Sequence, residues 1–168
     1  RHLISEQPIG HGFGYGDIDN DGEGEFVFLK GYLKRYGDTW KHIPAFDMAR
    51  WDASCPILVA DIDGDGRSEM IVGGAHSYGL DWWKEEDGVW KAHPIDPFNA
   101  QYHDLKWVDI DGDGKPELVT GKRHRAHNGH EKGEDDPLGI YYFKWTGEGF
   151  VKQVVDYVMP GESGGGCG

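Results

Sequence analysis

Three acidic loops contain the clearest candidate chemistry in this chain of 168 residues. Each loop has Asp at positions 1, 3 and 5, Gly at position 6 and Glu at position 9, and the copies occupy residues 17–25, 61–69 and 109–117. Carboxylates at this spacing repel one another unless a cation lies between them. Because Ca²⁺ accepts about six to eight oxygen ligands at flexible angles, the loops predict three calcium sites, with Mg²⁺ as the weaker candidate.

The expected ligands are the side chains at positions 1, 3, 5 and 9 and the backbone carbonyl at position 7. They are Asp17, Asp19, Asp21, Glu23 and Glu25; Asp61, Asp63, Asp65, Arg67 and Glu69; and Asp109, Asp111, Asp113, Lys115 and Glu117. An EF-hand has its last Glu at about position 12 between two helices, whereas short β-forming runs surround these loops, so each loop is expected to join two strands. The alternative is a turn without an ion, since Asp and Gly are ordinary turn residues.

Histidines form a second group of candidates, with nine in the chain. Relative to the acidic loops, His11 and His103 both lie six residues before the first Asp, where the second repeat has Cys55. His76 and His124 both lie fifteen residues after it. Since equivalent positions of repeated units lie on one face, several of these side chains are expected to converge, in a set made of His76, His103, His124, His127, Tyr78, Arg123 and Arg125.

Such a cluster would bind sugars or act in acid/base catalysis, because His exchanges protons near neutral pH. The catalytic candidates are His76, His103, His124 and His127, with Arg123 as a positioning group. Imidazole also suits zinc, but the spacing of His124, His127 and His130 matches no standard zinc signature, so zinc is a minor alternative. The structural alternative is that these side chains form hydrogen bonds between repeats.

The loops begin 44 and 48 residues apart, and a period of this size indicates repeated supersecondary units. In the second repeat, the expected strands cover 57–60, 70–73, 80–84 and 89–95. Four strands in about 45 residues predict a β-propeller blade, so the expected fold is all-β, with three four-stranded repeats. The expected division is a surplus outer strand and lead-in at 1–12, blade 1 at 13–50, blade 2 at 51–98, blade 3 at 99–158 with an inserted loop at 123–137, and a Gly-rich tail at 159–168.

Three blades are too few for an ordinary ring, because propellers close with about four to eight. The blades are therefore expected to form an incomplete ring or part of a larger assembly. The surplus strand and the Gly-rich tail predict open edges, which recruit strands from other chains. Other copies of this chain are the expected partners, in a dimeric ring or a filament, and a fragment of a longer propeller would have the same features.

Composition narrows the expected setting. The formal net charge of −13 argues against nucleic acid and anionic membrane surfaces as partners. No apolar run approaches the roughly 18 residues of a membrane span. Calcium loops of modest affinity fill where calcium is abundant, which predicts an extracellular, secreted protein. Cys55 and Cys167 allow one disulfide, links between chains or two free thiols.

The acidic loops, each followed by a short apolar strand, resemble the FG-GAP/VCBS repeats of calcium-binding β-propellers over nearly the whole chain. Such repeats occur in adhesins, integrin-type receptors, polysaccharide lyases and many secreted bacterial proteins, so this resemblance implies a fold and not one function. A narrower resemblance lies in residues 73–83, in His103-Asp104 and in residues 121–129. These segments are similar to the propeller domain of aldos-2-ulose dehydratases, carbohydrate enzymes whose propeller is part of a larger chain.

Two functions follow from these observations. The first is an extracellular, calcium-stabilised propeller module for glycan binding, adhesion or structural self-assembly, because the chain has three loops and no recognisable nucleophile motif. The alternative is a carbohydrate-active dehydratase or lyase that uses the His/Arg cluster on the propeller face.

Overall fold

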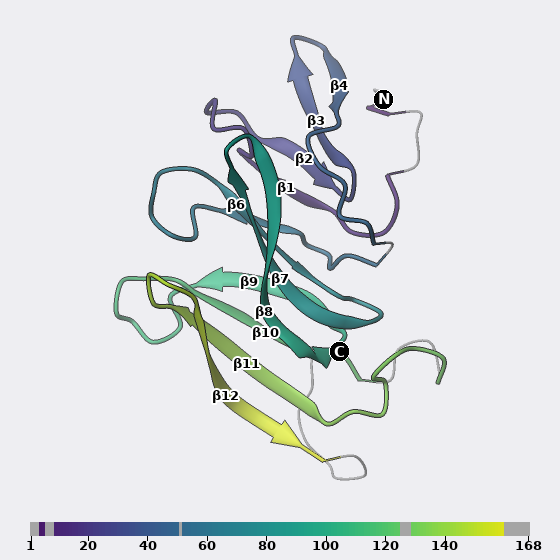
Figure 1. Ribbon diagram of the computed structural model, residues 1–168, viewed down its shortest axis with the longest axis vertical. Helices are drawn as coiled ribbons and strands as arrows, with labels where there is room; N and C mark the ends of the chain where they lie inside the picture. The colour runs from purple at the N-terminus through teal and green to yellow at the C-terminus, as the bar shows by residue number, and fades with distance from the viewer. Residues whose placement is uncertain (1–3, 6–8, 51, 125–128, 160–168) are drawn as a thin grey trace.

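The structure is a computed structural model, and it describes residues 4–5, 9–50, 52–124 and 129–159 (Figure 1). These ranges contain twelve β-strands and no helix, arranged in three antiparallel sheets of four strands each. Within them, no helix is long and apolar enough to cross a membrane. The prediction of an all-β fold built from three four-stranded, propeller-like blades is confirmed.

Each sheet, called a blade below, contains four strands in chain order. Blade 1 comprises β1 (Gly14–Gly16), β2 (Glu25–Phe28), β3 (Gly31–Tyr36) and β4 (Thr39–Ile43). Blade 2 comprises β5 (Leu58–Ala60), β6 (Glu69–Gly73), β7 (Tyr78–Glu86) and β8 (Val89–Ala100). Blade 3 comprises β9 (Tyr102–Val108), β10 (Glu117–Lys122), β11 (Leu138–Trp145) and β12 (Phe150–Val158). Each acidic loop joins the first and second strands of its blade, as the sequence predicts.

The expected segments at the two ends of the chain lie mostly outside the described residues, and one blade boundary shifts. Ile4 and Ser5 belong to no strand, and the rest of the expected surplus strand lies outside the described residues. Most of the Gly-rich tail lies outside them as well. Strand β8 ends at Ala100, two residues past the boundary expected for blade 2.

The inner strands β1, β5 and β9 lie side by side, and glycines make this approach close. A Cβ atom on Gly14 would lie 2.2 Å from the carbonyl oxygen of Ile57, and one on Gly73 would lie 2.3 Å from that of Tyr102. Any side chain at these positions would push neighbouring blades apart. The glycines therefore fix the blade spacing that brings residues of three blades together.

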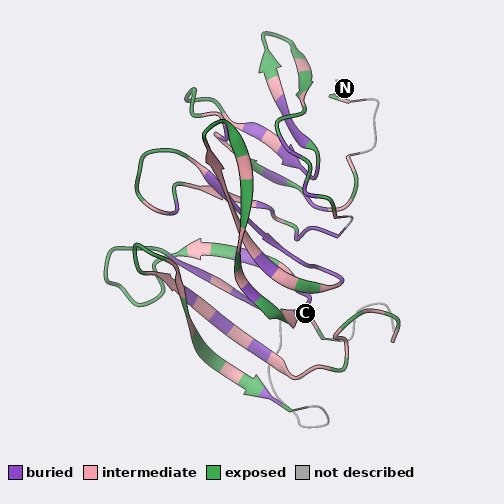
Figure 2. Ribbon diagram, viewed as in Figure 1, coloured by how far each residue is buried: buried purple, intermediate pink, exposed green. Residues whose placement is uncertain are grey.

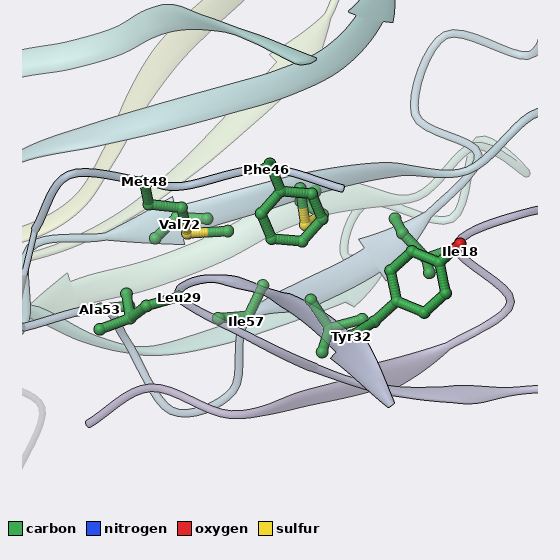
Figure 3. Close-up of a cluster of buried hydrophobic side chains, with 10 residues drawn as sticks. Ile18, Leu29, Tyr32, Phe46, Met48, Ala53, Ile57 and Val72 are labelled. Carbon is green, nitrogen blue, oxygen red and sulfur yellow. The ribbon is translucent and has the colours of Figure 1, made fainter. Parts of the chain in front are cut away.

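Two apolar cores fill the spaces between neighbouring blades. Strand β6 is buried on both faces, because Met70 and Val72 belong to the core shared with blade 1 and Ile71 to the core shared with blade 3. Figure 3 shows the first core, where Tyr32 of β3 and Ile57 lie among the labelled side chains. Figure 2 shows how burial decreases from β6 and β10 toward the outer strands β4 and β12.

Blade 1 has an aromatic row on the face turned away from blade 2. Gly14 and Gly16 of β1 face blade 2, so Phe13 and Tyr15 point to the opposite side. There Phe26 stacks on Phe13, with ring centroids 5.5 Å apart, and lies 4.9 Å from Trp40 by the same measure. Tyr15 is 60% exposed, which is high for an aromatic residue within a sheet.

Candidate functional site

The three acidic loops share one backbone geometry. The position-1 Asp accepts a hydrogen bond from the position-6 Gly amide in every copy, at 2.9 Å (Asp17 and Gly22), 3.0 Å (Asp61 and Gly66) and 2.9 Å (Asp109 and Gly114). These glycines have φ between 87° and 91°, a left-handed conformation in which a side chain would be strained. The position-4 residue is also left-handed, and Asn20 adopts it with φ 60° where the other loops have Gly.

The position-9 Glu links each loop to the interior. Its Oε2 accepts a hydrogen bond from the amide of the position-2 Ile, at 3.1 Å for Glu25, 2.8 Å for Glu69 and 3.1 Å for Glu117. Burial raises the pKa of both Glu25 and Glu69 above the usual range of a carboxyl. These side chains are thus held in a fixed rotamer with the second oxygen turned toward the loop carboxylates.

The loops have a donor set that fits a hard divalent cation. One oxygen from each of the side chains at positions 1, 3 and 9 lies within 4.8 Å of the others, in all three loops. In the first loop, Asp19 Oδ1 is buried and has no hydrogen-bond partner in the described part of the chain. A bound Ca²⁺ would supply the positive charge that such oxygens require. The expected ligand residues therefore fit calcium, and its presence remains a prediction.

A lysine from the third strand of each blade reaches into its acidic loop. Lys34 Nζ forms ion pairs with Asp19 and Asp21. Lys84 Nζ pairs with Asp63, with Asp65 at 2.7 Å and with Glu69 at 3.5 Å. Lys144 Nζ pairs with Asp111, with Asp113 at 3.2 Å and with Glu117 at 3.6 Å. The repeated pattern of the loops did not predict that these lysines contact them.

A separate cluster contains one histidine from each blade. His11 lies just before β1, His76 in the turn between β6 and β7, and His103 in β9. One ring nitrogen from each lies within 4.8 Å of the others. The rings of His11 and His76 meet edge to face, with centroids 4.6 Å apart. Nε2 of His11 and Nε2 of His76 lie 3.0 Å apart.

The outer nitrogens of these rings determine where their protons lie. His11 Nδ1 is 2.9 Å from the carbonyl oxygen of Ala53, which can only accept, so this nitrogen carries a proton. His76 Nδ1 can donate to the carboxylate of Glu131 or accept from Arg123 Nη2, which lies 3.1 Å away, so either tautomer of His76 has a partner. In the tautomer in which His76 Nδ1 donates to Glu131, both Nε2 atoms present lone pairs to each other. Two lone pairs at 3.0 Å repel, so this tautomer favours a cation between them, whereas a proton on His76 Nε2 makes the contact a hydrogen bond to His11 Nε2.

Charged and polar groups surround His76 on its outer side. Glu131 of the inserted loop is 7% exposed and accepts hydrogen bonds from Arg123 Nη2 at 3.1 Å and from Gln101 Nε2 at 3.2 Å. Arg123 Nη2 also lies 3.1 Å from His76 Nδ1. Burial lowers the pKa of His103, and the nearby charges of Arg123 and the other two histidines lower it further. His103 is therefore held as the neutral imidazole that metals bind.

The inserted loop is anchored on both sides of Glu131. The buried Lys122 donates hydrogen bonds to the backbone carbonyls of Arg123 at 3.2 Å and Glu134 at 3.0 Å. Tyr78 Oη donates to Asp136 Oδ2 at 2.7 Å. Because Lys122 belongs to blade 3 and Tyr78 to blade 2, these bonds fix the carboxylate of Glu131 next to His76.

The expected convergence of His76, His103 and Arg123 is present in the structure. His124 is exposed and lies outside the three-histidine cluster. His11 and Glu131 also belong to this cluster but were not among its expected members, although His11 occupies the position equivalent to His103. His127, Arg125 and Cys167 lie outside the described residues, so the disulfide alternatives for the exposed Cys55 stay a prediction.

Residues 61–120 match the family described as FG-GAP-like repeat. The matched segment begins at the first Asp of the second acidic loop and ends in β10, just after the third loop. No curated protein matches the chain. This part of the chain is therefore similar to FG-GAP-like repeats, which agrees with a propeller-type module.

Proposed function

We propose that this propeller-type module binds one zinc-class metal ion between His11, His76 and His103 and uses it in a lyase reaction on a carbohydrate. The observation that supports this most directly is the pair of facing Nε2 atoms of His11 and His76, 3.0 Å apart. Zn–N bonds of about 2.0–2.1 Å require ligand nitrogens at only slightly larger separations. Three imidazoles leave one coordination position open, as in catalytic zinc sites.

The surroundings of the histidines also favour a metal. A ligating imidazole usually donates its other N–H to a carboxylate or a backbone carbonyl, which fixes the tautomer and the ring orientation. His76 Nδ1 contacts the carboxylate of Glu131, and His11 Nδ1 lies 2.9 Å from the carbonyl oxygen of Ala53. Each partner is the type that such a site needs.

The substrate class comes from the segments that resemble aldos-2-ulose dehydratases, since they include His76, His103 and Arg123. In the elimination proposed here, a C–H bond next to a sugar ketone breaks and its electron pair forms a C=C bond. The hydroxyl on the following carbon leaves, and with the released proton it forms water. A bound zinc ion would supply Lewis acidity toward the ketone oxygen. Arg123, beside His76, would donate hydrogen bonds to substrate oxygens, while Glu131 holds the His76 ring.

Metal analysis and turnover test this proposal in sequence. Chain purified with zinc should retain about one equivalent per chain after desalting, and Co²⁺ substitution should give visible absorption bands of a nitrogen-ligated site. His76→Ala should lose the metal, whereas His93→Ala, on β8 and paired with Glu86, should keep it. Absence of zinc binding by the wild-type chain rejects the site. Zinc binding without formation of an unsaturated ketone from any aldos-2-ulose, followed by ultraviolet absorption, rejects the lyase reaction alone.

The aromatic row on blade 1 favours a second function, assembly of calcium-stabilised modules. In a closed propeller this face packs against another blade, and Tyr15 is the exposed centre of the row. We propose that further copies of the chain cover it while calcium holds the acidic loops. Light scattering after size exclusion, with calcium and with a chelator, should show a multimer that Tyr15→Ser weakens. A monomer in both conditions would exclude this function.

A further inference from the structure

We propose that Lys34, Lys84 and Lys144 act as tethered counter-cations that hold the acidic loops in shape without a metal and compete with Ca²⁺ for the same carboxylates. The proposal rests on the calcium binding proposed above and is independent of the histidine cluster. It concerns all three blades, because each one has the same arrangement.

The lysines occupy one structural position, which strand pairing reveals. Leu33, Trp83 and Phe143 pair across the sheet with the residues that directly follow the position-9 Glu. Each lysine comes next along its strand and so stands opposite that Glu. Along the sequence, however, the lysines follow the Glu by nine, fifteen and twenty-seven residues. The lysine reaches the same structural position in each blade although its distance along the sequence from the Glu differs. This favours a role for the lysine in the loop over a coincidence of composition.

Each ammonium contacts carboxylates that are expected to bind the metal. In blade 2, Lys84 Nζ contacts the position-3 and position-5 carboxylates and lies 3.5 Å from Glu69 Oε1. In blade 3, Lys144 has the same three partners. In blade 1, Lys34 contacts the position-3 and position-5 carboxylates. The position-3 Asp is thus shared by the lysine and by the group of oxygens that could hold a metal.

A divalent ion and the ammonium cannot both lie against these carboxylates without strong repulsion. Like charges at contact distance repel, and they do so more strongly in a partly buried site than in water. The lysine must therefore leave when calcium enters, and its ion pairs are lost. The consequence is a loop that stays folded without calcium and binds calcium more weakly than its carboxylates alone would allow.

Lys84→Met tests the competition, because it keeps the apolar stem and removes the charge. Calorimetric titration with Ca²⁺ should give at least about tenfold tighter binding at one site than in the wild type. In chelator, the same variant should have a lower melting temperature than the wild type. Addition of calcium should raise its melting temperature by more than it raises that of the wild type. Lys91→Met, whose ammonium pairs only with Glu86 among the described residues, serves as the control and should behave like the wild type. If Lys84→Met is poorly folded, Lys84→Gln replaces it.

The possible results distinguish the competition by lysine from calcium binding itself. Equal or weaker calcium affinity in Lys84→Met rejects the competition while leaving calcium binding intact. Absence of binding in both the wild type and the variant at about 10 mM calcium, above the range of extracellular calcium modules, rejects the calcium sites themselves and the competition with them.

Discussion

Asn20 Oδ1 in the first acidic loop accepts a hydrogen bond from the backbone amide of Ser68 in the second loop, at 2.8 Å. This bond connects blades 1 and 2 at their loops, away from the apolar core. The second and third loops have no equivalent bond, because Gly64 has no side chain and Pro116 has no N–H. This hydrogen bond between loops is therefore particular to blades 1 and 2.

Asn20→Gly should destabilise the chain by about 0.5–1.5 kcal/mol, since Gly keeps the left-handed backbone and removes only this hydrogen bond. Urea unfolding measures the loss. Ser68→Pro removes the donor and copies the residue that the third loop has. The double variant should lose no more than either single variant, and fully additive losses would show that the bond is not what stabilises the pair of loops.

Asp96→Asn should remove a stabilising contribution that depends on pH. Asp96 Oδ2 accepts hydrogen bonds from Lys152 Nζ at 2.7 Å and from Tyr102 Oη at 2.9 Å, which connect blades 2 and 3. Burial raises its pKa, but the hydrogen bonds from Lys152 and Asn99 outweigh burial and lower the pKa to about 2. The stabilisation from Asp96 is present above the pKa of about 3.9 that its carboxyl has in the unfolded chain. It is lost as pH falls from about 4 to about 2.

The free energy of unfolding of the wild type should therefore exceed that of Asp96→Asn by about 2 kcal/mol at pH 6, and the difference should shrink below pH 3. Urea unfolding across this pH range measures it, with Asp38→Asn at an exposed position as the control. A difference between wild type and Asp96→Asn that stays constant from pH 6 to pH 2 would contradict the assignment to this carboxylate.

Glu131→Gln should weaken zinc binding by about ten- to a hundredfold without abolishing it, because the amide oxygen still accepts from His76 Nδ1 but has no charge. Competition with a chromophoric chelator measures the affinity. Glu148→Gln, in the exposed turn before β12, should leave it unchanged. An unchanged affinity in Glu131→Gln would mean that the carboxylate does not support the metal site.

Glu69→Ala should destabilise blade 2 even in chelator, by about 1–3 kcal/mol, because the buried amide of Ile62 loses its acceptor. Glu69→Gln keeps an acceptor oxygen and should lose less. Urea unfolding in the presence of chelator separates this structural role from calcium binding. Equal losses in the two variants would contradict it.

The blades and the acidic loops could be predicted because their information is local. All expected ligands of a loop lie within nine residues, and the apolar β-forming segments beside it define the first two strands. The histidine cluster is not local in this sense. Alignment of the repeats places His11 and His103 at equivalent positions, but equivalent positions do not show which side chains are in contact. Glu131 lies in an insertion that the other repeats lack.

The lysines escaped prediction for a related reason. Lys84 reaches its loop because a hairpin pairs β6 with β7, and the hairpin lengths differ between blades. Only the strand register brings each lysine opposite its Glu. His124 shows the reverse error, since a matched sequence position placed it in a cluster that it does not join.

One histidine from each blade builds the cluster, and this has a consequence for how such a protein can evolve. Duplication of a single blade copies an acidic loop complete with its ligands and its lysine. It cannot copy the histidine centre, which exists only where three particular neighbours adjoin. An additional blade inserted between His11 and His76 would leave every loop intact and eliminate the centre, so the array can lengthen at its ends but not within this trio.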